Sequence, residues 1–252
     1  MKTLYEVVSG SRAYGTDTPE SDIDIRGVVV PPLEYFFGFS CHFEQQEHKD
    51  QEGNDSVHYD IRKFMKLAAD ANPNILELLF VPEDCIRIID ETFRPILENR
   101  NLFLSNKAKK TYIGYAKSQL KKMNPEQVDY DDTIVTWPTY NKKNAMHLIR
   151  LLRTGLELVS SGELHVHRPD AKELLEIRNG NWSYEQLIEH SRFLENEINK
   201  QESVLPDKPD MRALNLLCME CISENLHISV DIVREDVWNR NVDHYLEERK
   251  NK

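Results

Sequence analysis

The sequence predicts an α+β protein in which a mixed β-sheet with flanking helices is followed by an all-helical region. Two patterns predict this class. Runs of β-branched and alternating residues, separated by turn residues, occupy the first hundred or so of the 252 residues. From about residue 105 onward the apolar residues recur at helical spacing. We therefore expect two domains, residues 1–104 and 105–252.

The first region contains the predicted strands. Valine-rich and isoleucine-rich runs bracket a Gly-Ser turn, and the second of these runs stops at Pro31. Two alternating runs flank the polar stretch KDQEGND, which predicts a hairpin. Pro73 separates two helical patterns and stands where a first helical turn tolerates proline. The predicted strands are 3–8, 23–31, 41–48, 56–64 and 84–90, and the predicted helices are 61–72 and 73–81.

The second region contains only predicted helices. Gly162 and Gly180 stand where two of them should end, because glycine adopts the left-handed conformation of a helix C-cap. Residues 124–139 are rich in Pro, Asp and Trp, lack periodicity, and are predicted as a loop. The predicted helices are 106–123, 141–162, 168–180, 183–203 and 210–236.

Composition excludes several classes of protein. A formal net charge of −11 argues against a protein that coats nucleic acid non-specifically. No apolar run is long enough for a membrane span or a signal peptide, so we expect a cytoplasmic protein with reduced cysteines. Residues 105–153 nevertheless carry a local charge of +6. Two interpretations stay open for this segment, a phosphate-binding face and ordinary solvated helix surfaces.

The candidate site begins with two aspartates one residue apart. If SDIDIRGVVV is a strand, Asp22 and Asp24 share one face, and their mutual repulsion calls for a cation between them. Magnesium fits because it takes oxygen ligands and leaves positions for substrate phosphates. Gly10 and Ser11 precede the pair in a turn whose backbone N–H groups can approach a phosphate, with Arg12 beside it. An EF-hand calcium loop is disfavoured, since the sequence after Asp24 turns apolar.

A third carboxylate on a neighbouring strand would complete a two-metal site. Asp60, in the strand-like run SVHYDIRKF, is the candidate that we select. Together, the turn and the acids suit phosphoryl or nucleotidyl transfer.

These residues carry a resemblance to a known family. SGSRAYG, ESDIDIRGV and HYDIR resemble the Gly-Ser, Asp-x-Asp and later single-acid motifs of the DNA polymerase β-like nucleotidyltransferase superfamily. Within it the chain is similar to a branch of predicted nucleotidyltransferases from bacteria and phages, some associated with RNA repair. The resemblance extends through NPNILELLF, AMHLIRLLRTGLELVSSGEL, RPDAKELLEIRNG and LPDKPD, and so covers most of the chain.

The resemblance implies a role for each matching position. Gly10 and Ser11 would hold the β- and γ-phosphates of a nucleoside triphosphate, and Asp22 and Asp24 would ligate two Mg²⁺ ions. Asp60 would bind the catalytic metal and assist deprotonation of the acceptor hydroxyl. The reaction implied is transfer of a nucleoside monophosphate from an NTP such as ATP, with release of pyrophosphate.

Residues of the helical region are further candidates. Lys143, His147 and Arg150 lie at helical spacing and are candidates to contact a triphosphate or an RNA backbone. The alternative is that Arg150 forms an ion pair with the acidic first region and that His147 is a packing residue.

The function expected from the sequence is Mg²⁺-dependent nucleotidyl transfer onto an acceptor hydroxyl. An RNA or tRNA end is one candidate acceptor, and a protein hydroxyl or a small molecule stays open as well. If the protein is encoded by a phage, it would act in the host cytoplasm. Two rivals stay open: a non-catalytic nucleotide-binding module, and a toxin- or antitoxin-type transferase that modifies a protein or tRNA. The sequence does not predict the oligomeric state.

Overall fold

The computed structural model describes residues 1–51, 54–123 and 140–228. Within these residues the strands form one five-stranded sheet in the order β3-β4-β2-β1-β5. β2 and β4 pair in parallel, and the other neighbours pair antiparallel. The mixed sheet confirms the predicted fold class. The strands are β1 (Lys2–Ser9), β2 (Asp24–Val30), β3 (Gln45–Lys49), β4 (Asp55–Asp60) and β5 (Ile86–Ile89).

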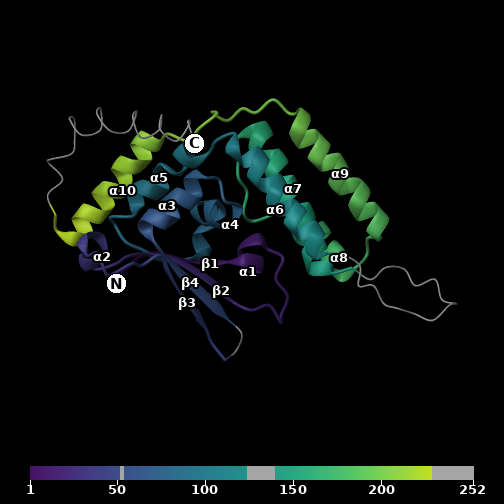
Figure 1. Cartoon of the computed structure of the whole chain (residues 1–252). Coiled ribbons are helices and arrows are strands. Elements are labelled where there is room, and N and C mark those ends of the chain that lie inside the picture. The colour runs from purple at the N-terminus through teal and green to yellow at the C-terminus, as the bar shows by residue number, and fades with distance from the viewer. Residues whose placement is uncertain (52–53, 124–139, 229–252) are drawn as a thin grey trace.

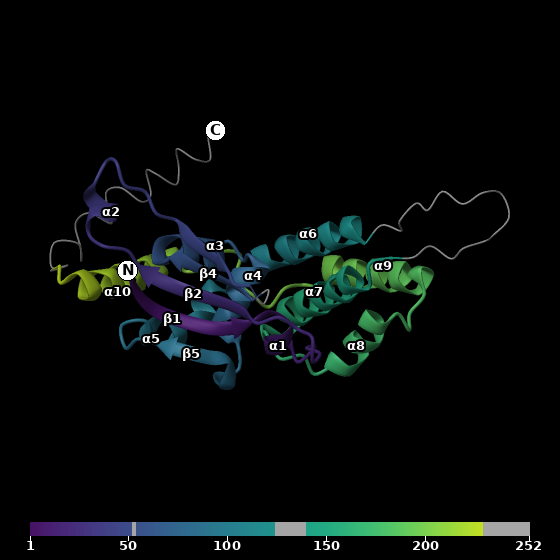
Figure 2. The ribbon, with the colours of Figure 1, turned by 90° about the horizontal axis from the view of Figure 1, so that it is seen from below.

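The helices lie over one face of the sheet and beyond one of its ends (Figure 1). Figure 2 views the molecule from below, at 90° to Figure 1, so that the strands lie in front of α3. The first region contains α1 (Gly10–Tyr14), α2 (Glu34–Phe37), α3 (Ile61–Ala69), α4 (Pro73–Leu76), α5 (Arg94–Glu98) and the 3-10 segments η1 (Glu77–Phe80), η2 (Glu83–Cys85) and η3 (Arg100–Phe103). The second contains α6 (Lys107–Lys122), α7 (Lys142–Ser161), α8 (Ala171–Asn179), α9 (Tyr184–Lys200) and α10 (Met211–Leu226).

Local signals set several element ends. Pro73 occupies the first turn of α4, and the Asn72 side chain caps that helix. The helix predicted over 73–81 changes to 3-10 geometry at Glu77. Gly162 and Gly180 end α7 and α8 in the left-handed conformation, with φ of 74° and 88°, as predicted. The loop predicted at 124–139 lies outside the described residues.

The core lies between the sheet and its helical layer. Tyr5 of β1 stacks on Phe93 at 5.0 Å, and Phe64 of α3 meets Phe93 edge-on at 6.1 Å. All three rings are buried. Each stabilises the fold by about 1.5–3 kcal/mol through removal of apolar area from water.

The helical region packs around α7, which contacts α6, α8 and α9. Gly155 lets α7 approach α6 closely, since a Cβ there would lie 2.9 Å from the Cβ of Tyr112. In both views α10 lies apart from α6 and α9, back against α3 and α5. The boundary at 104/105 stays a prediction. Across the described ranges, no helix has the length and apolar character needed to cross a membrane.

Candidate active site

Sheet register brings two carboxylates together at one end of the sheet. Asp24 is the first residue of β2 and pairs with Ser9, the last residue of β1. On its other side Asp24 pairs with Asp55, the first residue of the parallel strand β4. Paired residues on adjacent strands share a face, so the two carboxylates lie side by side. Asp55 was missed by the sequence reasoning.

The Asp24 and Asp55 carboxylates lie side by side, and their pKa values shift in opposite directions. Burial and a hydrogen bond to Asp55 raise the pKa of Asp24 to about 6, against the lowering effect of Arg26. The Arg26 guanidinium lies 2.6 Å from an oxygen of Asp55 and 3.5 Å from one of Asp24. It holds the pKa of Asp55 below its ordinary value. Arg26 therefore supplies the positive charge that two adjacent carboxylates require.

Gly10 lies directly against this pair. Its φ of +66° is left-handed, and a Cβ there would stand 2.1 Å from an Oδ of Asp24. Only glycine satisfies both conditions. The Ser9 hydroxyl donates to the Asp24 carbonyl at 3.3 Å. The Gly10 turn and the Asp24 carboxylate therefore pack directly against each other.

Three other predicted residues lie close by in sequence or in space. Asp22 precedes β2, is exposed, and its charge contributes to the raised pKa of Asp24. Ser11 is half-buried in α1. Arg12 is exposed and donates to the Ser21 carbonyl at 3.1 Å, so it ties down the loop between α1 and β2.

The structure does not bring Asp60 to this site, which corrects the expectation of a third acid there. Asp60 is the last residue of β4, in register with Val29, and stands about 16 Å along the strand from Asp55. Its carboxylate caps α3 by accepting from the Arg62 N–H at 2.7 Å and forms an ion pair with the Arg62 guanidinium at 2.7 Å. The first contact is that of a helix N-cap, and the second is an ion pair that neutralises the buried carboxylate.

Arg150 and His147 both contact the Tyr14 ring of α1. Arg150 is buried, bonds both oxygens of Glu77 at 2.9 and 3.0 Å, and stacks 3.8 Å from the centre of the Tyr14 ring. Burial and nearby cations lower the pKa of His147 to about 3, and its ring meets Tyr14 edge-on. Arg150 thus forms an ion pair with the first region and His147 packs against an aromatic ring, as the alternative interpretation of these two residues expects. Lys143 is exposed on α7.

Arg150 belongs to a wider set of contacts that we call the clamp, by which the helical region holds α1 and the residues after it. The Arg168 N–H donates to the Tyr14 carbonyl at 3.0 Å, and the Arg178 guanidinium donates to the Thr16 carbonyl at 2.8 Å. Gly15 is required between them, because a Cβ there would lie 2.7 Å from the His167 ring. The clamp fixes α1 relative to α7 and α8.

A cavity of about 260 Å³ opens beside Asp24. It lies between the start of β2, the residues around Gly10 and the α4–η1 segment, and it contains both a carboxylate and a guanidinium. Its lining consists of Ser9, Gly10, Ala13, Tyr14, Asp24, Arg26, Val57, Tyr59, Asn74, Glu77, Leu78, Val81 and Val166.

The donor chemistry at this end of the sheet is that of a hard cation site. In the described part of the chain, no group of three or more His, Cys, Asp or Glu side chains is arranged to hold a metal ion. Asp24 and Asp55 nevertheless present oxygen ligands side by side, with the Asp22 charge close to them. Two adjacent carboxylates of this kind fit Mg²⁺ or a similar ion.

Known proteins are similar to parts of this sequence. A curated protein of Enterobacteria phage T4, described as an uncharacterized 38.9 kDa protein in the nrdC-mobD intergenic region, is 34% identical over 131 residues, covering 48% of this chain and 39% of the phage protein. The protein YcgL of Bacillus subtilis strain 168 is 34% identical over 79 residues, covering 31% of this chain and 30% of YcgL. The chain thus matches well under two thirds of the length of these relatives.

The family assignment covers far more of the chain. The model of the family RlaP, the RNA repair pathway DNA polymerase beta family, matches residues 1–220. These residues include the carboxylate pair, Gly10 and the clamp. The chain belongs to the RNA repair pathway DNA polymerase beta family of nucleotidyltransferases.

Proposed function

We propose that this protein transfers a nucleoside monophosphate from an NTP to an acceptor hydroxyl and releases pyrophosphate. The observation that carries the proposal is the contact between Asp24 and Asp55 beside Gly10. Family membership supports it, because DNA polymerase β-type enzymes use an NTP and divalent metals.

In this proposal Asp24 and Asp55 hold the metal, with Asp22 as a further ligand. Two Mg²⁺ ions, when bound, neutralise developing charge on the phosphates and make the acceptor hydroxyl more acidic. Arg26 moves off the carboxylates and becomes free to contact a phosphate. Asp55 replaces Asp60 as the carboxylate beside the acceptor hydroxyl, because it is the acid in register with Asp24.

Gly10 and Ser11 would receive the β- and γ-phosphates. Gly10 carries no side chain, so its backbone can approach a phosphate closely beside Asp24. The cavity at Asp24 would take another part of the nucleotide, and Tyr14 and Tyr59 in its lining offer aromatic surface. We propose an RNA end as the acceptor, in line with the RNA repair pathway named in the family description.

The test compares three Asp→Asn variants in one assay. The protein is incubated with α-labelled NTPs, Mg²⁺ and separate pools of RNA, protein and metabolites, and both label transfer and pyrophosphate are measured. Asp24→Asn and Asp55→Asn should reduce turnover at least about a hundredfold, since each removes a metal ligand. Asp60→Asn is the matched control, because asparagine caps a helix as well as aspartate does, and it should retain turnover.

Each contrary outcome points to a specific alternative. If Asp60→Asn abolishes turnover while Asp55→Asn does not, the assignment of the third acid is wrong. Tight NTP binding without transfer in any pool would indicate a nucleotide-binding module. Label on the protein pool instead of RNA would indicate a protein-modifying transferase.

A further inference from the structure

The α6 helix is the most basic element of an acidic protein. It carries six lysines and no acidic residue, although the whole chain has a net charge of −11. Three of these lysines have partners: Lys107 with Asp70 at 2.8 Å, Lys117 with Glu195 at 2.6 Å, and Lys109 with two backbone carbonyls. The side-chain ammonium groups of the other three form no hydrogen bond or ion pair with the described residues: Lys110, Lys121 and Lys122.

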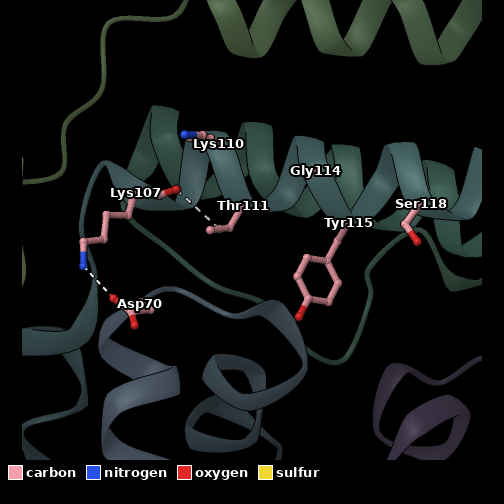
Figure 3. A pocket seen from close by; sticks show the side chains of 7 residues that line it. All are labelled: Asp70, Lys107, Lys110, Thr111, Gly114, Tyr115 and Ser118. Atoms are coloured by element: carbon pink, nitrogen blue, oxygen red, sulfur yellow. Dashed lines mark hydrogen bonds and ion pairs between the residues drawn. The ribbon is translucent and has the colours of Figure 1, made fainter. Parts of the chain in front are cut away.

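One side of this helix borders an open groove of about 590 Å³ (Figure 3). Its lining positions on α6 are spaced three or four residues apart, so they form one stripe along the helix. Asp70, at the end of α3, closes one edge through its ion pair with Lys107. The stripe consists of Lys107, Lys110, Thr111, Gly114, Tyr115 and Ser118.

Gly114 keeps the middle of the groove open. A Cβ built on Gly114 meets no atom within 4 Å, so neither packing nor backbone conformation explains a glycine here. Glycine in a helix interior also lowers helix stability relative to alanine. A substitution at this position therefore changes the groove without disturbing a native contact.

Tyr115 supplies an aromatic ring to the groove. Its ring projects from α6 toward the α3–α4 side of the groove (Figure 3). The α4 helix contacts α6, and Asn74 of α4 lines the cavity beside Asp24, so α4 adjoins both the groove and this cavity. Tyr59 lines the cavity that contains Asp24 and Arg26. One phenol thus borders the groove and the other borders the acid pair.

We propose that this α6 groove binds a single-stranded RNA and directs its terminal hydroxyl toward Asp24 and Asp55. Lysines along the stripe would contact phosphates, and Tyr115 would stack on a base. A basic groove with an aromatic platform is the usual arrangement for binding a single strand. The proposal rests on the proposed function for the identity of the acceptor.

An RNA strand fits these features better than an acidic peptide does. An acidic peptide would use the lysines but would require neither a base-stacking ring nor a path to a nucleotidyl-transfer site. A duplex would need contacts across two grooves, whereas the stripe from Lys107 to Ser118 extends only about 16 Å.

The test measures RNA binding without catalysis. A labelled single-stranded RNA of about 16 nucleotides, the upper size for one single-strand-binding domain, is titrated with the full chain by fluorescence anisotropy. Gly114→Glu places bulk and a negative charge in the groove and should weaken binding at least about tenfold. Gly114→Ala adds one methyl group in open space and should bind within about twofold of wild type. Thermal unfolding verifies that both variants fold.

A second pair of variants tests the lysines. Lys110 lines the groove, and Lys121 stands three residues beyond Ser118, so it continues the stripe toward the end of α6. The double change Lys110→Gln and Lys121→Gln should reduce the slope of log affinity against log salt by about 1.4, or about 0.7 for each lost phosphate contact. Lys172→Gln, on α8, changes the charge on a helix away from the groove and should leave the slope unaltered. Equal binding by Gly114→Glu and wild type would overturn the proposal, as would a slope that the double change does not alter.

This outcome is distinguishable from failure of the proposed function. If the groove proposal alone fails, Gly114→Glu retains RNA binding and the wild type still transfers label. If the proposed function alone fails, the wild type transfers no label, yet RNA binding still depends on Gly114 and the lysines. Stronger inhibition of binding by an acidic peptide than by unlabelled RNA would reassign the groove to a protein partner and overturn the proposal.

Discussion

Replacing Arg150 by methionine should be among the most destabilising single substitutions in the molecule. The Arg150 and Glu77 side chains are only 4% and 3% exposed. Methionine preserves most of the apolar stem but removes the guanidinium. The Glu77 carboxylate would then stay buried without its counter-charge. Its remaining described hydrogen-bond donor would be the Tyr14 hydroxyl, at 2.9 Å. Breaking a buried ion pair in this way costs about 3–5 kcal/mol of unfolding free energy.

The double variant should be more stable than the single losses imply. Glu77→Gln alone leaves the Arg150 cation buried without its counter-charge, which should also cost several kcal/mol. Combining Glu77→Gln with Arg150→Met removes both charges. The double variant should therefore lose about 0.5–3 kcal/mol less unfolding free energy than the sum of the two single losses. The Arg150 Nε has no hydrogen-bond partner among the described residues, so the native pair is itself imperfectly satisfied.

Urea denaturation of the wild type, both single variants and the double variant measures this coupling. Single domains are stable by only about 5–15 kcal/mol, so a loss of this size is easily resolved. A loss below about 1 kcal/mol for Arg150→Met, or additive losses in the double variant, would refute the reasoning. Either result would mean that the pair is solvated in the native protein.

Three further predictions concern the candidate site and the adjoining helix. Gly10→Ala should reduce turnover and lower the melting temperature, because its Cβ would displace the Asp24 carboxylate and φ is +66°; native turnover would contradict this. Arg26→Gln should enlarge the rise in melting temperature that Mg²⁺ produces, since the ion would then replace a missing counter-charge; an equal rise in both proteins would count against it. His147 has its pKa lowered from 6.5 to about 3, so an unfolded chain takes up this proton first as the pH falls below 6.5. Between pH 6 and 4 the unfolding free energy of the wild type should therefore fall more steeply than that of His147→Phe, by up to about 1.4 kcal/mol per pH unit. Urea denaturation at several pH values measures both profiles, and parallel profiles would argue against a buried neutral imidazole.

Local signals made most of the fold predictable. The Pro73 helix start and the glycine ends at Gly162 and Gly180 depend on backbone conformations that few residues adopt, so their positions appear directly in the sequence. Strand pairing in the hairpin was equally local, since β3 and β4 are joined by a short polar turn.

The third acid was not predictable in the same way. Strand β4 has an aspartate at each end, and only the parallel register with β2 decides which one adjoins Asp24. Parallel pairing joins strands that are distant in the chain, so no turn fixes it locally. One signal did distinguish the two, because Asp60 directly precedes an amphipathic helix and so stands at an N-cap position.

The clamp has a consequence for how substrates enter the site. Arg150, Arg168 and Arg178 bind the end of α1 and the residues after it through buried or part-buried contacts, so separating the helical region from Gly10 would break several of them at once. At about 3–5 kcal/mol for the Arg150 pair alone, such an opening would be a rare event. Arg26, in contrast, reaches its partners through a half-buried side chain at the cavity wall. We therefore expect substrate and metal to enter by rotation of this one side chain while the helical region keeps its contacts with α1.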